Sequence, residues 1–315
     1  MIIYRSIGEV QLESSAVAIG VFDGVHRGHQ QVLRKAAEAA KELGGQSLAL
    51  TFDRHPAELI APRYAPLYIS CLDQRIEMIE HYCPVDCILV TPFDLSFADL
   101  SASEFVSRVL VDRLHARRIF VGADFRYGKD RLGGVMDLEA AGETHGFDVN
   151  VIHSVSDLGE RVSSTRVRAL IDAGEIGRAE RLLGHPFAMR GTVIAGKRLG
   201  RVLGYPTANV RPEQSRQLLP AAGVYAARAI VHADSRRRKL WRAAVSVGVN
   251  PTTDFDDGRY KVEAYIMDGF DEDIYGSTIE IEFVKRLRGE EKFESLAALV
   301  VQIRIDVEQV ESVLR

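Results

Sequence analysis

A short segment near the N-terminus combines two histidines with three glycines. Its sequence is GVFDGVHRGH, at residues 20–29, between a run typical of a buried strand and a run typical of an amphipathic helix. Where a strand of a parallel sheet leads into a helix, free N–H groups and the positive end of the helix dipole can bind phosphate. Glycines there let the backbone approach a nucleotide closely. The residues that we assign to this nucleotide site are Gly20, Phe22, Gly24, His26 and His29.

The two histidines have the spacing of a phosphate-binding pair. His26 and His29 are three residues apart, so on the first turn of a helix their rings would share one face. Such a pair suits adenylyl transfer, because attack on the α-phosphorus of ATP needs positive charge and hydrogen-bond donors rather than a protein nucleophile. The alternative is that both histidines only cap a helix, but their place beside a glycine at this turn favours a catalytic role.

A second stretch, RVSSTRVRAL at residues 161–170, combines hydroxyl side chains with arginines at the predicted start of a helix. Hydroxyls, free N–H groups and guanidinium groups together can bind the β- and γ-phosphates of ATP. Taken alone, the Ser-Ser-Thr run is more typical of an ordinary helix cap. In combination with the histidine motif, we assign these phosphates to Arg161, Ser163, Ser164, Thr165 and Arg168.

The C-terminal half has a different candidate, the tetrapeptide PTAN at residues 206–209, which follows glycines and basic residues. The sequence contains no GxxxxGK[ST] loop, so a phosphate site here must be of another kind. In an extended segment, a Thr hydroxyl and an Asn carbonyl two residues apart point the same way, as two oxygen ligands for Mg²⁺. An isolated PTAN is otherwise typical of a turn. We assign Thr207 and Asn209 to Mg²⁺, and the ATP-binding set is Gly196, Lys197, Gly204, Pro206, Thr207 and Asn209.

Hydrophobic patterns predict the elements that must position these residues. From residue 16 to about 184, short apolar runs alternate with helical stretches, which is typical of a parallel sheet covered by helices. After residue 186, strand-like runs separated by turns continue to a final helix at 295–315. We expect an α/β, Rossmann-like domain at 1–184 with helices on both faces of its sheet, then a small antiparallel β-barrel with a C-terminal helix at 185–315. The expected elements of the first domain are strands at 16–22, 47–52, 86–90 and 117–122 and helices at 30–43 and 101–115.

Composition excludes several classes of protein. The chain has 315 residues, a net charge of -4 and a pI near 6.2, which argues against broad binding to nucleic acid or an anionic membrane. The basic run at 236–239 is interpreted as a solvated hairpin turn. Three cysteines form no paired framework, and we expect Cys83 and Cys87 to be buried thiols rather than zinc ligands. With no signal-like N-terminus and no apolar stretch of about 20 residues, the chain is expected to be cytoplasmic.

The two phosphate motifs resemble the adenylyltransferase module of the prokaryotic bifunctional riboflavin kinase/FAD synthetase family. Nucleotidyltransferases with other substrates share these motifs, so they indicate only the reaction class. TFDRHPAE at 51–58 and VGADFRYG at 121–128 are similar to the flavin-side segments of the family and carry the flavin assignment. Arg54 stands where many relatives have proline. The resemblance implies that the flavin contacts Phe52, Pro56, Asp124 and Phe125.

Four segments of the C-terminal half resemble a riboflavin kinase domain: LGRVLGYPTANV at 199–210, GVYAA at 223–227, SVGVNPTTD at 246–254 and VEAYIMDGFDEDIYG at 262–276. The resemblance implies that Glu263 is the catalytic base that accepts the proton of the riboflavin hydroxyl. Val262 and Ala264 alternate with it in the strand, so its side chain can face a ligand. Tyr265, where relatives usually have His, and the additional Gly269 depart from the family pattern.

The family implies two reactions in sequence. Riboflavin and ATP would give FMN and ADP in the C-terminal half, and FMN and ATP would give FAD and pyrophosphate in the N-terminal half, with Mg²⁺ as cofactor. Two alternatives stay open: an adenylyltransferase for another phosphorylated acceptor, and a flavin-binding regulator whose kinase half is inactive, as Tyr265 and Gly269 could indicate. Neither nucleic acid nor a membrane is an expected partner. A weak homo-oligomer is left open.

Overall fold

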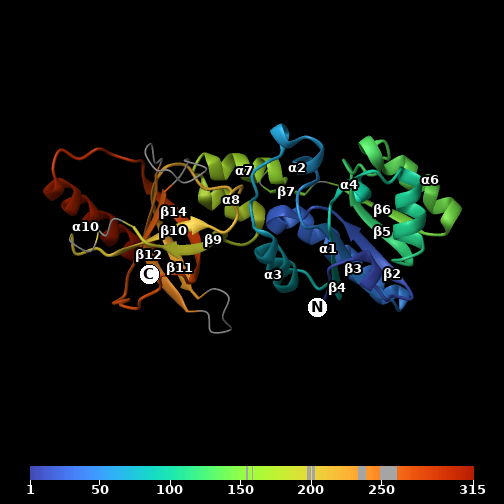
Figure 1. Cartoon of the computed structure of the whole chain (residues 1–315), viewed down its shortest axis with the longest axis horizontal. Helices are drawn as coiled ribbons and strands as arrows, with labels where there is room; N and C mark the ends of the chain where they lie inside the picture. Colours follow the sequence, from blue (N-terminus) through green and yellow to red (C-terminus); the bar gives the residue numbers. More distant parts are fainter. Residues whose placement is uncertain (154, 158, 197–199, 201–202, 233–238, 249–260) are drawn as a thin grey trace. The chain divides into compact units, whose positions relative to one another are not determined.

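The structure is a computed structural model that describes residues 1–153, 155–157, 159–196, 200, 203–232, 239–248 and 261–315. It forms two compact units (Figure 1). The first unit consists of Met1–Pro66 and Leu72–Ser163, and the second consists of Leu67–Cys71 and Ser164–Arg315. The short segment Leu67–Cys71 therefore belongs to the second unit, although the residues on both sides of it belong to the first.

The first unit is built on a six-stranded sheet with the strand order β1-β4-β3-β2-β5-β6. Every neighbouring pair in this sheet is parallel, which confirms the expected α/β, Rossmann-like fold. The expected set of strands lacks β1, which has only three residues, and β6, in which polar residues interrupt the apolar ones. The strands are β1 (Ile2–Tyr4), β2 (Ser15–Ile19), β3 (Gln46–Phe52), β4 (Cys87–Thr91), β5 (Ala116–Gly122) and β6 (Asp148–Ile152).

Helices cover both faces of this sheet (Figure 1). Strand β2 points two alanines toward one face and Val17 and Ile19 toward the other, and all four are buried. On the alanine face, helices α1 (Arg27–Leu43) and α3 (Leu72–Tyr82) pack against the strands. The other face is covered by α6 (Val135–His145) and by the π-helical segment η4 (Phe105–Val111).

The helix predicted for 101–115 starts at the expected capping box but ends early. Ser101 caps the short helix α5 (Ala102–Glu104), and η4 follows it directly. At the end of η4, an N–H group bonds the carbonyl five residues before it, a winding that apolar spacing in a sequence does not reveal. His115, which the prediction makes helical, has a φ of 46° and turns the chain into β5.

Strand β2 is the point at which the chain changes direction across the sheet. The strands that come next, β3 and β4, lie on one side of it, whereas β5 and β6 lie on the other. In open parallel sheets, ligands bind outside the carboxyl ends of the strands at such a switch point. The histidine loop at 20–29 follows β2 and the segment that contains Asp124 follows β5, so both predicted motifs are next to this point.

The second unit contains a closed barrel with the strand order β10-β13-β12-β11-β14-β9, and its neighbouring strands are antiparallel. This confirms the expected antiparallel barrel. In β13, Val262, Ala264 and Ile266 are buried, whereas Glu263 and Tyr265 on the opposite side are half-buried. The strands are β9 (Phe187–Ile194), β10 (Thr207–Pro212), β11 (Gly223–Val231), β12 (Leu240–Gly248), β13 (Lys261–Ile266) and β14 (Thr278–Arg288).

Shorter elements complete both units. Helices α7 (Ser164–Asp172) and α8 (Ile176–Leu183) precede the barrel in the second unit. The first unit also has α2 (Pro56–Ile60), α4 (Leu95–Ala98) and a hairpin of β7 (Ser156–Asp157) and β8 (Glu160–Arg161). All three cysteines are free and buried, as expected for Cys83 and Cys87. Within the part of the chain that the structure describes, no helix is long and apolar enough to cross a membrane.

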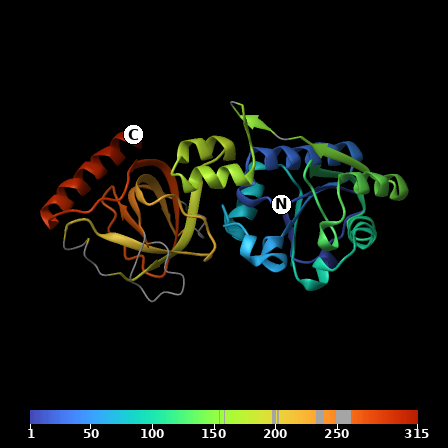
Figure 2. The same ribbon diagram turned by 90° about the horizontal axis from the view of Figure 1, so that it is seen from above.

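The C-terminal helix α10 (Leu296–Val313) lies against the outside of the barrel (Figures 1 and 2). Its Val310 packs with Ala226 and Met267. Asp306 accepts hydrogen bonds of 2.9 and 2.7 Å from the guanidinium group of Arg288, and the side chain of Asp306 is only 5% exposed. An apolar cluster around Val310 and a largely buried ion pair therefore anchor the helix.

We predict that Asp306→Ala destabilises the barrel by about 3 kcal/mol, because it leaves the partly buried cation of Arg288 without its carboxylate. Trp241, the single tryptophan of the chain, lies in β12 and reports unfolding of the barrel by fluorescence during a urea titration. The control is Asp268→Asn, which removes the more exposed ion pair with Arg242. Equal shifts of the urea midpoint in the two variants would contradict the anchoring role.

Candidate functional site

The loop after β2 has a backbone conformation that few side chains adopt. Phe22 and Val25 have φ values of 53° and 37°, in the left-handed region, and Gly24 between them has a φ of 72°. Each non-glycine residue in this region costs about 1–3 kcal/mol and persists only where its surroundings hold it. Both side chains are buried, with Phe22 at 2% and Val25 at 0% exposure. The core of the first unit therefore holds this loop, which Gly20 opens directly after the strand.

The two histidines lie side by side at the start of α1. The prediction places both on the first helical turn, but His26 is the N-cap, and its Nδ1 accepts a 3.2 Å hydrogen bond from the N–H of His29. Their rings stack with centroids 3.6 Å apart, and Phe22 meets His29 edge-on at 5.4 Å. The two imidazoles therefore converge, although only one belongs to the helix.

The β7–β8 hairpin brings the second predicted phosphate segment to the same place. Arg27, next to His26, forms a 3.2 Å ion pair with Asp157 of the hairpin. At the end of the hairpin, Arg161 lies 3.9 Å from the carboxylate of Asp124, and both side chains are largely exposed. The start of this motif therefore lies beside the histidine loop, at the carboxyl ends of β2 and β5.

The rest of the second motif continues into the other compact unit. Ser163 is the last residue of the first unit, and Ser164 and Thr165 begin α7 in the second. Within the second unit, Nε of Arg168 donates a 2.7 Å hydrogen bond to the carbonyl of Leu67. Arg168 therefore joins α7 to the short segment that the first half of the chain contributes to the second unit.

A row of aromatic rings joins the two predicted flavin segments. Phe52 ends β3 and lies 5.7 Å from the ring of Phe97. Phe125, which follows β5, stacks on Tyr127 at 5.6 Å. Phe105 lies between them, 6.0 Å from Phe97 and 5.5 Å from Tyr127. The sequence predicted both ends of the row but not the rings of Phe97, Phe105 and Tyr127 between them. Phe97 follows strand β4, so the rule that ligand residues follow parallel strands could have identified it.

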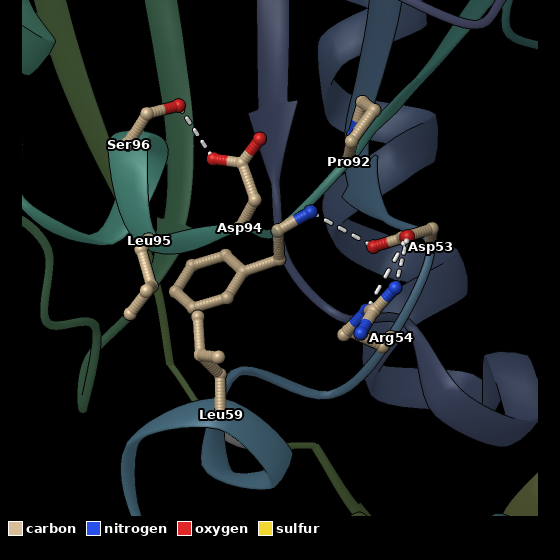
Figure 3. A pocket seen from close by; sticks show the side chains of 8 residues that line it. Asp53, Arg54, Leu59, Pro92, Asp94, Leu95 and Ser96 are labelled. Atoms are coloured by element: carbon tan, nitrogen blue, oxygen red, sulfur yellow. Dashed lines mark hydrogen bonds and ion pairs between the residues drawn. The ribbon is translucent and has the colours of Figure 1, made fainter.

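A cavity of about 420 Å³ opens at the carboxyl ends of β3 and β4 (Figure 3). Phe93, whose ring packs on Phe52 at 5.3 Å, forms part of its wall. None of the four implied flavin residues lines the cavity, although Phe52 directly precedes a lining residue in the chain. The cavity is lined by Asp53, Arg54, Leu59, Pro92, Phe93, Asp94, Leu95 and Ser96.

Two carboxylates and a guanidinium group give this cavity its charge (Figure 3). Asp53 accepts a 2.8 Å hydrogen bond from the N–H of Phe93 and a 3.3 Å bond from Arg54. Asp94 accepts a 2.6 Å bond from the hydroxyl of Ser96. That bond, together with the N–H of Phe97, holds the pKa of Asp94 below its ordinary value. The cavity wall therefore combines apolar surface with fixed charges.

Strand pairing in the barrel brings the predicted kinase residues onto one face. Asn209 of β10 pairs with Glu263 of β13, which also pairs with Ser246 of β12. Paired residues of neighbouring strands point to the same side, and Thr207 shares it because it lies two residues before Asn209. The Glu263 carboxylate forms a 2.8 Å ion pair with Lys261. Because the opposite face forms the barrel core, these polar side chains lie on its outer surface.

The other residues predicted to bind ATP in this half precede β10. A Cβ atom at Gly196 would lie 2.1 Å from Nδ2 of Asn209, so only glycine fits at this position. Gly204 has a φ of 84°, and Pro206 comes directly before the strand. Lys197 lies outside the residues that the structure describes, as do parts of the basic run at 236–239 and of the SVGVNPTTD segment.

The two departures from the family pattern near Glu263 leave its strand pairing intact. Tyr265 pairs with Thr207, and its ring meets Tyr205 edge-on at 5.3 Å. Burial, and then the neighbouring Tyr205, raise the pKa of Tyr265. Gly269 has a φ of 73° and lies in a turn beyond the end of β13. The additional glycine is therefore accommodated outside the strand.

Comparisons with known proteins cover both halves of the chain. The FAD synthetase family model matches residues 9–166, and the riboflavin kinase family model matches residues 183–314. The bifunctional riboflavin kinase/FMN adenylyltransferase of Pseudomonas fluorescens is 39% identical over 92% of this chain and 89% of its own length. The protein of the same description from Haemophilus influenzae is 37% identical over 94% of this chain and 93% of its own length.

A solved structure extends the similarity to the three-dimensional fold. It is described as a macrolide-efflux protein from Streptococcus pneumoniae, is 32% identical and has a TM-score of 0.83, with 98% of each chain covered. The FAD synthetase match favours FMN over another acceptor, and the full-length relatives are described as bifunctional enzymes rather than as regulators. The chain therefore belongs to the bifunctional riboflavin kinase/FMN adenylyltransferase family, with the adenylyltransferase in its N-terminal part and the kinase in its C-terminal part.

Proposed function

We propose that FMN is adenylylated at the carboxyl ends of β2 and β5 and that riboflavin is phosphorylated on the outer face of the barrel around Asn209 and Glu263. One observation carries the first assignment: the histidine loop, the hairpin with Arg161 and the segment with Asp124 meet at the switch point of the sheet. The pairing of Asn209 with Glu263 supports the second assignment.

In the adenylylation site, an oxygen of the FMN phosphate attacks the α-phosphorus of ATP. The bond from this phosphorus to the oxygen that bridges to the β-phosphate breaks, pyrophosphate leaves and FAD forms. The N–H groups at the start of α1 and the rings of His26 and His29 donate to the oxygens that gain charge. In the first unit, we assign Arg161 and Ser163 to the departing phosphates. Ser164, Thr165 and Arg168 are assigned to them from the sequence motif alone.

We assign the flavin side of FMN to the ends of β3, β4 and β5. The cavity beside Phe93 supports this, because its volume and its mixed apolar and charged wall are typical of small-molecule sites. Arg54, where many relatives have proline, adds a cation to that wall. The row of rings behind the cavity gives the site an apolar support. The proposed flavin contacts remain Phe52, Pro56, Asp124 and Phe125.

In the kinase site, Glu263 accepts the proton of the primary hydroxyl of riboflavin as its oxygen attacks the γ-phosphorus of ATP. The bond from this phosphorus to the β–γ bridging oxygen breaks, and FMN and ADP form. The strand pairing with Asn209 puts this carboxylate beside the proposed phosphate residues. We assign the ATP phosphates to the segment with Gly196, Lys197, Gly204 and Pro206.

The residues present on β10 fit a Mg²⁺ ion. Thr207 and Asn209 offer two hard oxygen donors on the same side of the strand. The absence of a side chain at Gly196 leaves the amide of Asn209 uncrowded. When bound, Mg²⁺ neutralises phosphate charge and orients the transferring group.

We propose residue 184/185 as the boundary between the two activities. The first family match ends at residue 166 and the second begins at 183, close to this boundary, whereas the two compact units divide earlier, between Ser163 and Ser164. We also place the protein in the cytoplasm, because a reducing compartment suits its three buried free thiols. Its proposed partners are riboflavin, FMN, FAD and ATP or ADP, and the net charge of -4 argues against broad binding to nucleic acid.

Replacing a residue of one site should stop one reaction only. In His29→Ala, we expect FAD formation to fall about 100-fold while riboflavin is still phosphorylated, so FMN accumulates. In Glu263→Gln, we expect riboflavin phosphorylation to fall about 100-fold while added FMN is still converted to FAD. Chromatographic separation of riboflavin, FMN and FAD over time measures both reactions. Loss of both reactions through either change in a folded protein would refute the two-site assignment.

The contact between Gly196 and Asn209 gives a second test. A methyl group in Gly196→Ala would displace the Asn209 side chain, and we expect kcat of riboflavin phosphorylation to fall at least about tenfold. FAD formation from added FMN should stay within about twofold, since the other site is untouched. The matched control is Gly177→Ala in α8, where a Cβ atom meets nothing within 4 Å. Equal kinase rates in the two variants would reject the assigned role of Asn209.

A further inference from the structure

Arg75 of α3 is the largest side chain that is fully buried among the described residues, with 1% exposure. A buried cation is unfavourable unless the protein supplies hydrogen bonds or opposite charge in place of water. Helix α3 packs beside the loop at 23–25, so this cation lies close to the start of the nucleotide loop. The contacts of its guanidinium group show what the residue holds.

The guanidinium group joins the ends of two neighbouring strands. Nη1 donates a 2.6 Å hydrogen bond to the carbonyl of Val21, two residues beyond the end of β2. Nη2 donates a 2.8 Å bond to the carbonyl of Phe52, the last residue of β3. Because the guanidinium group is planar, with its donors in a rigid fork, it holds the two carbonyls at a set separation.

The first of these bonds acts on the nucleotide loop. The Val21 carbonyl is part of the peptide group that joins Val21 to Phe22. The backbone of Phe22 is left-handed, with a φ of 53°. A second donor, the buried hydroxyl of Thr51, bonds the same carbonyl at 3.0 Å. The ring of Phe22 in turn meets His29 edge-on. Arg75 therefore fixes the peptide group before Phe22, and the ring of Phe22 contacts the histidine pair.

The second bond acts on the flavin side. The Phe52 carbonyl belongs to the peptide plane that leads into Asp53. The Asp53 carboxylate in turn accepts a hydrogen bond from the N–H of Phe93, and both residues line the cavity at the ends of β3 and β4. The buried side chain of Arg75 is thus bonded to the backbone at the start of both the nucleotide loop and the flavin-side segment.

We propose that Arg75 is a positioning residue for adenylyl transfer. It holds the nucleotide loop and the flavin-side segment in one alignment, so that the FMN phosphate oxygen meets the α-phosphorus in line. It touches neither substrate. This inference rests on the proposed location of adenylylation at the switch point of the sheet.

The test compares Arg75→Gln and Arg75→Lys with the wild type in the full-length chain. In Arg75→Gln, we expect kcat of FAD formation to fall at least about 30-fold, because a misplacement of about 1 Å costs about 100-fold in rate. The KM values for ATP and FMN should stay within about threefold, because each segment still binds its own substrate. Riboflavin phosphorylation, measured in the same preparation, should stay within about twofold and reports an intact second unit.

Arg75→Lys separates alignment from charge. A lysine keeps the positive charge but lacks the fork that reaches two carbonyls, so we expect kcat of FAD formation to stay at least about tenfold below the wild type. Full recovery by lysine would overturn the proposal in favour of charge alone. If Arg75→Gln does not fold, the test uses Arg75→Lys and Thr51→Val, alone and combined. Thr51→Val removes the other donor to the Val21 carbonyl. We expect the effects of these two changes to be non-additive, because they act on one carbonyl.

Ser47→Ala is the matched control for general stability. Ser47 is fully buried at the opposite end of β3, and its hydroxyl donates a 2.7 Å bond to Asp86. This variant loses a buried hydrogen bond of the same sheet, and we expect FAD formation within about twofold of the wild type. Equal losses of kcat in Ser47→Ala and Arg75→Gln, or a loss below about threefold in Arg75→Gln, would overturn the proposal.

His29→Ala, measured alongside, distinguishes failure of this inference from failure of the site assignment. Loss of FAD formation in His29→Ala with full activity in Arg75→Gln rejects the role of Arg75 alone. Full activity in His29→Ala rejects the location of the adenylylation site, and with it the basis of the inference.

Discussion

The adenylylation site depends on how strand β2 ends. Because β2 is parallel to both of its neighbours, β3 and β5, the connections that leave these three strands all start at the same edge of the sheet. The connection after β2 must turn a buried strand into a helix within a few residues. It does so through left-handed backbone at Phe22 and Val25, whose burial offsets the strain. The position of both histidines follows from this turn.

The kinase site follows a different constraint, the alternation of side chains in a closed barrel. Val262, Ala264 and Ile266 fill the core, so Glu263 must point outward and meets Asn209 across the strand pair. This geometry does not depend on the residues that depart from the family pattern. Tyr265 contributes ring contacts beside the site, and Gly269 is placed in a turn beyond the strand.

Much of this architecture is predictable from the sequence, because it depends on local signals. The alternation of apolar runs and helices predicts the parallel sheet, and the position of the 20–29 motif between a strand and a helix predicts the nucleotide loop. Helix α1 begins at Arg27, three residues before the predicted start at residue 30, and His26 is its N-cap rather than a residue of its first turn. Such boundaries depend on backbone hydrogen bonds that apolar spacing does not reveal.

Features that depend on distant contacts were not predictable. Arg75 lies in the polar-looking stretch LDQRIEMIE, and it bonds two backbone carbonyls, which leave no pattern in a sequence. The row of rings from Phe52 to Phe125 depends on the order of the strands. The membership of Leu67–Cys71 in the second unit depends on contacts with residues far along the chain.

The central claim is that one chain carries out two phosphorus-transfer reactions that attack different atoms of ATP. Isotopic labelling of ATP in the wild-type protein, supplied with riboflavin, tests this most directly. With label at the γ-phosphate, both FMN and FAD should become labelled, since the first phosphate is kept in the second product. With label at the α-phosphate, FAD should be labelled and FMN should not. Appearance of the α-label in FMN, or FAD without the γ-label, would contradict the account.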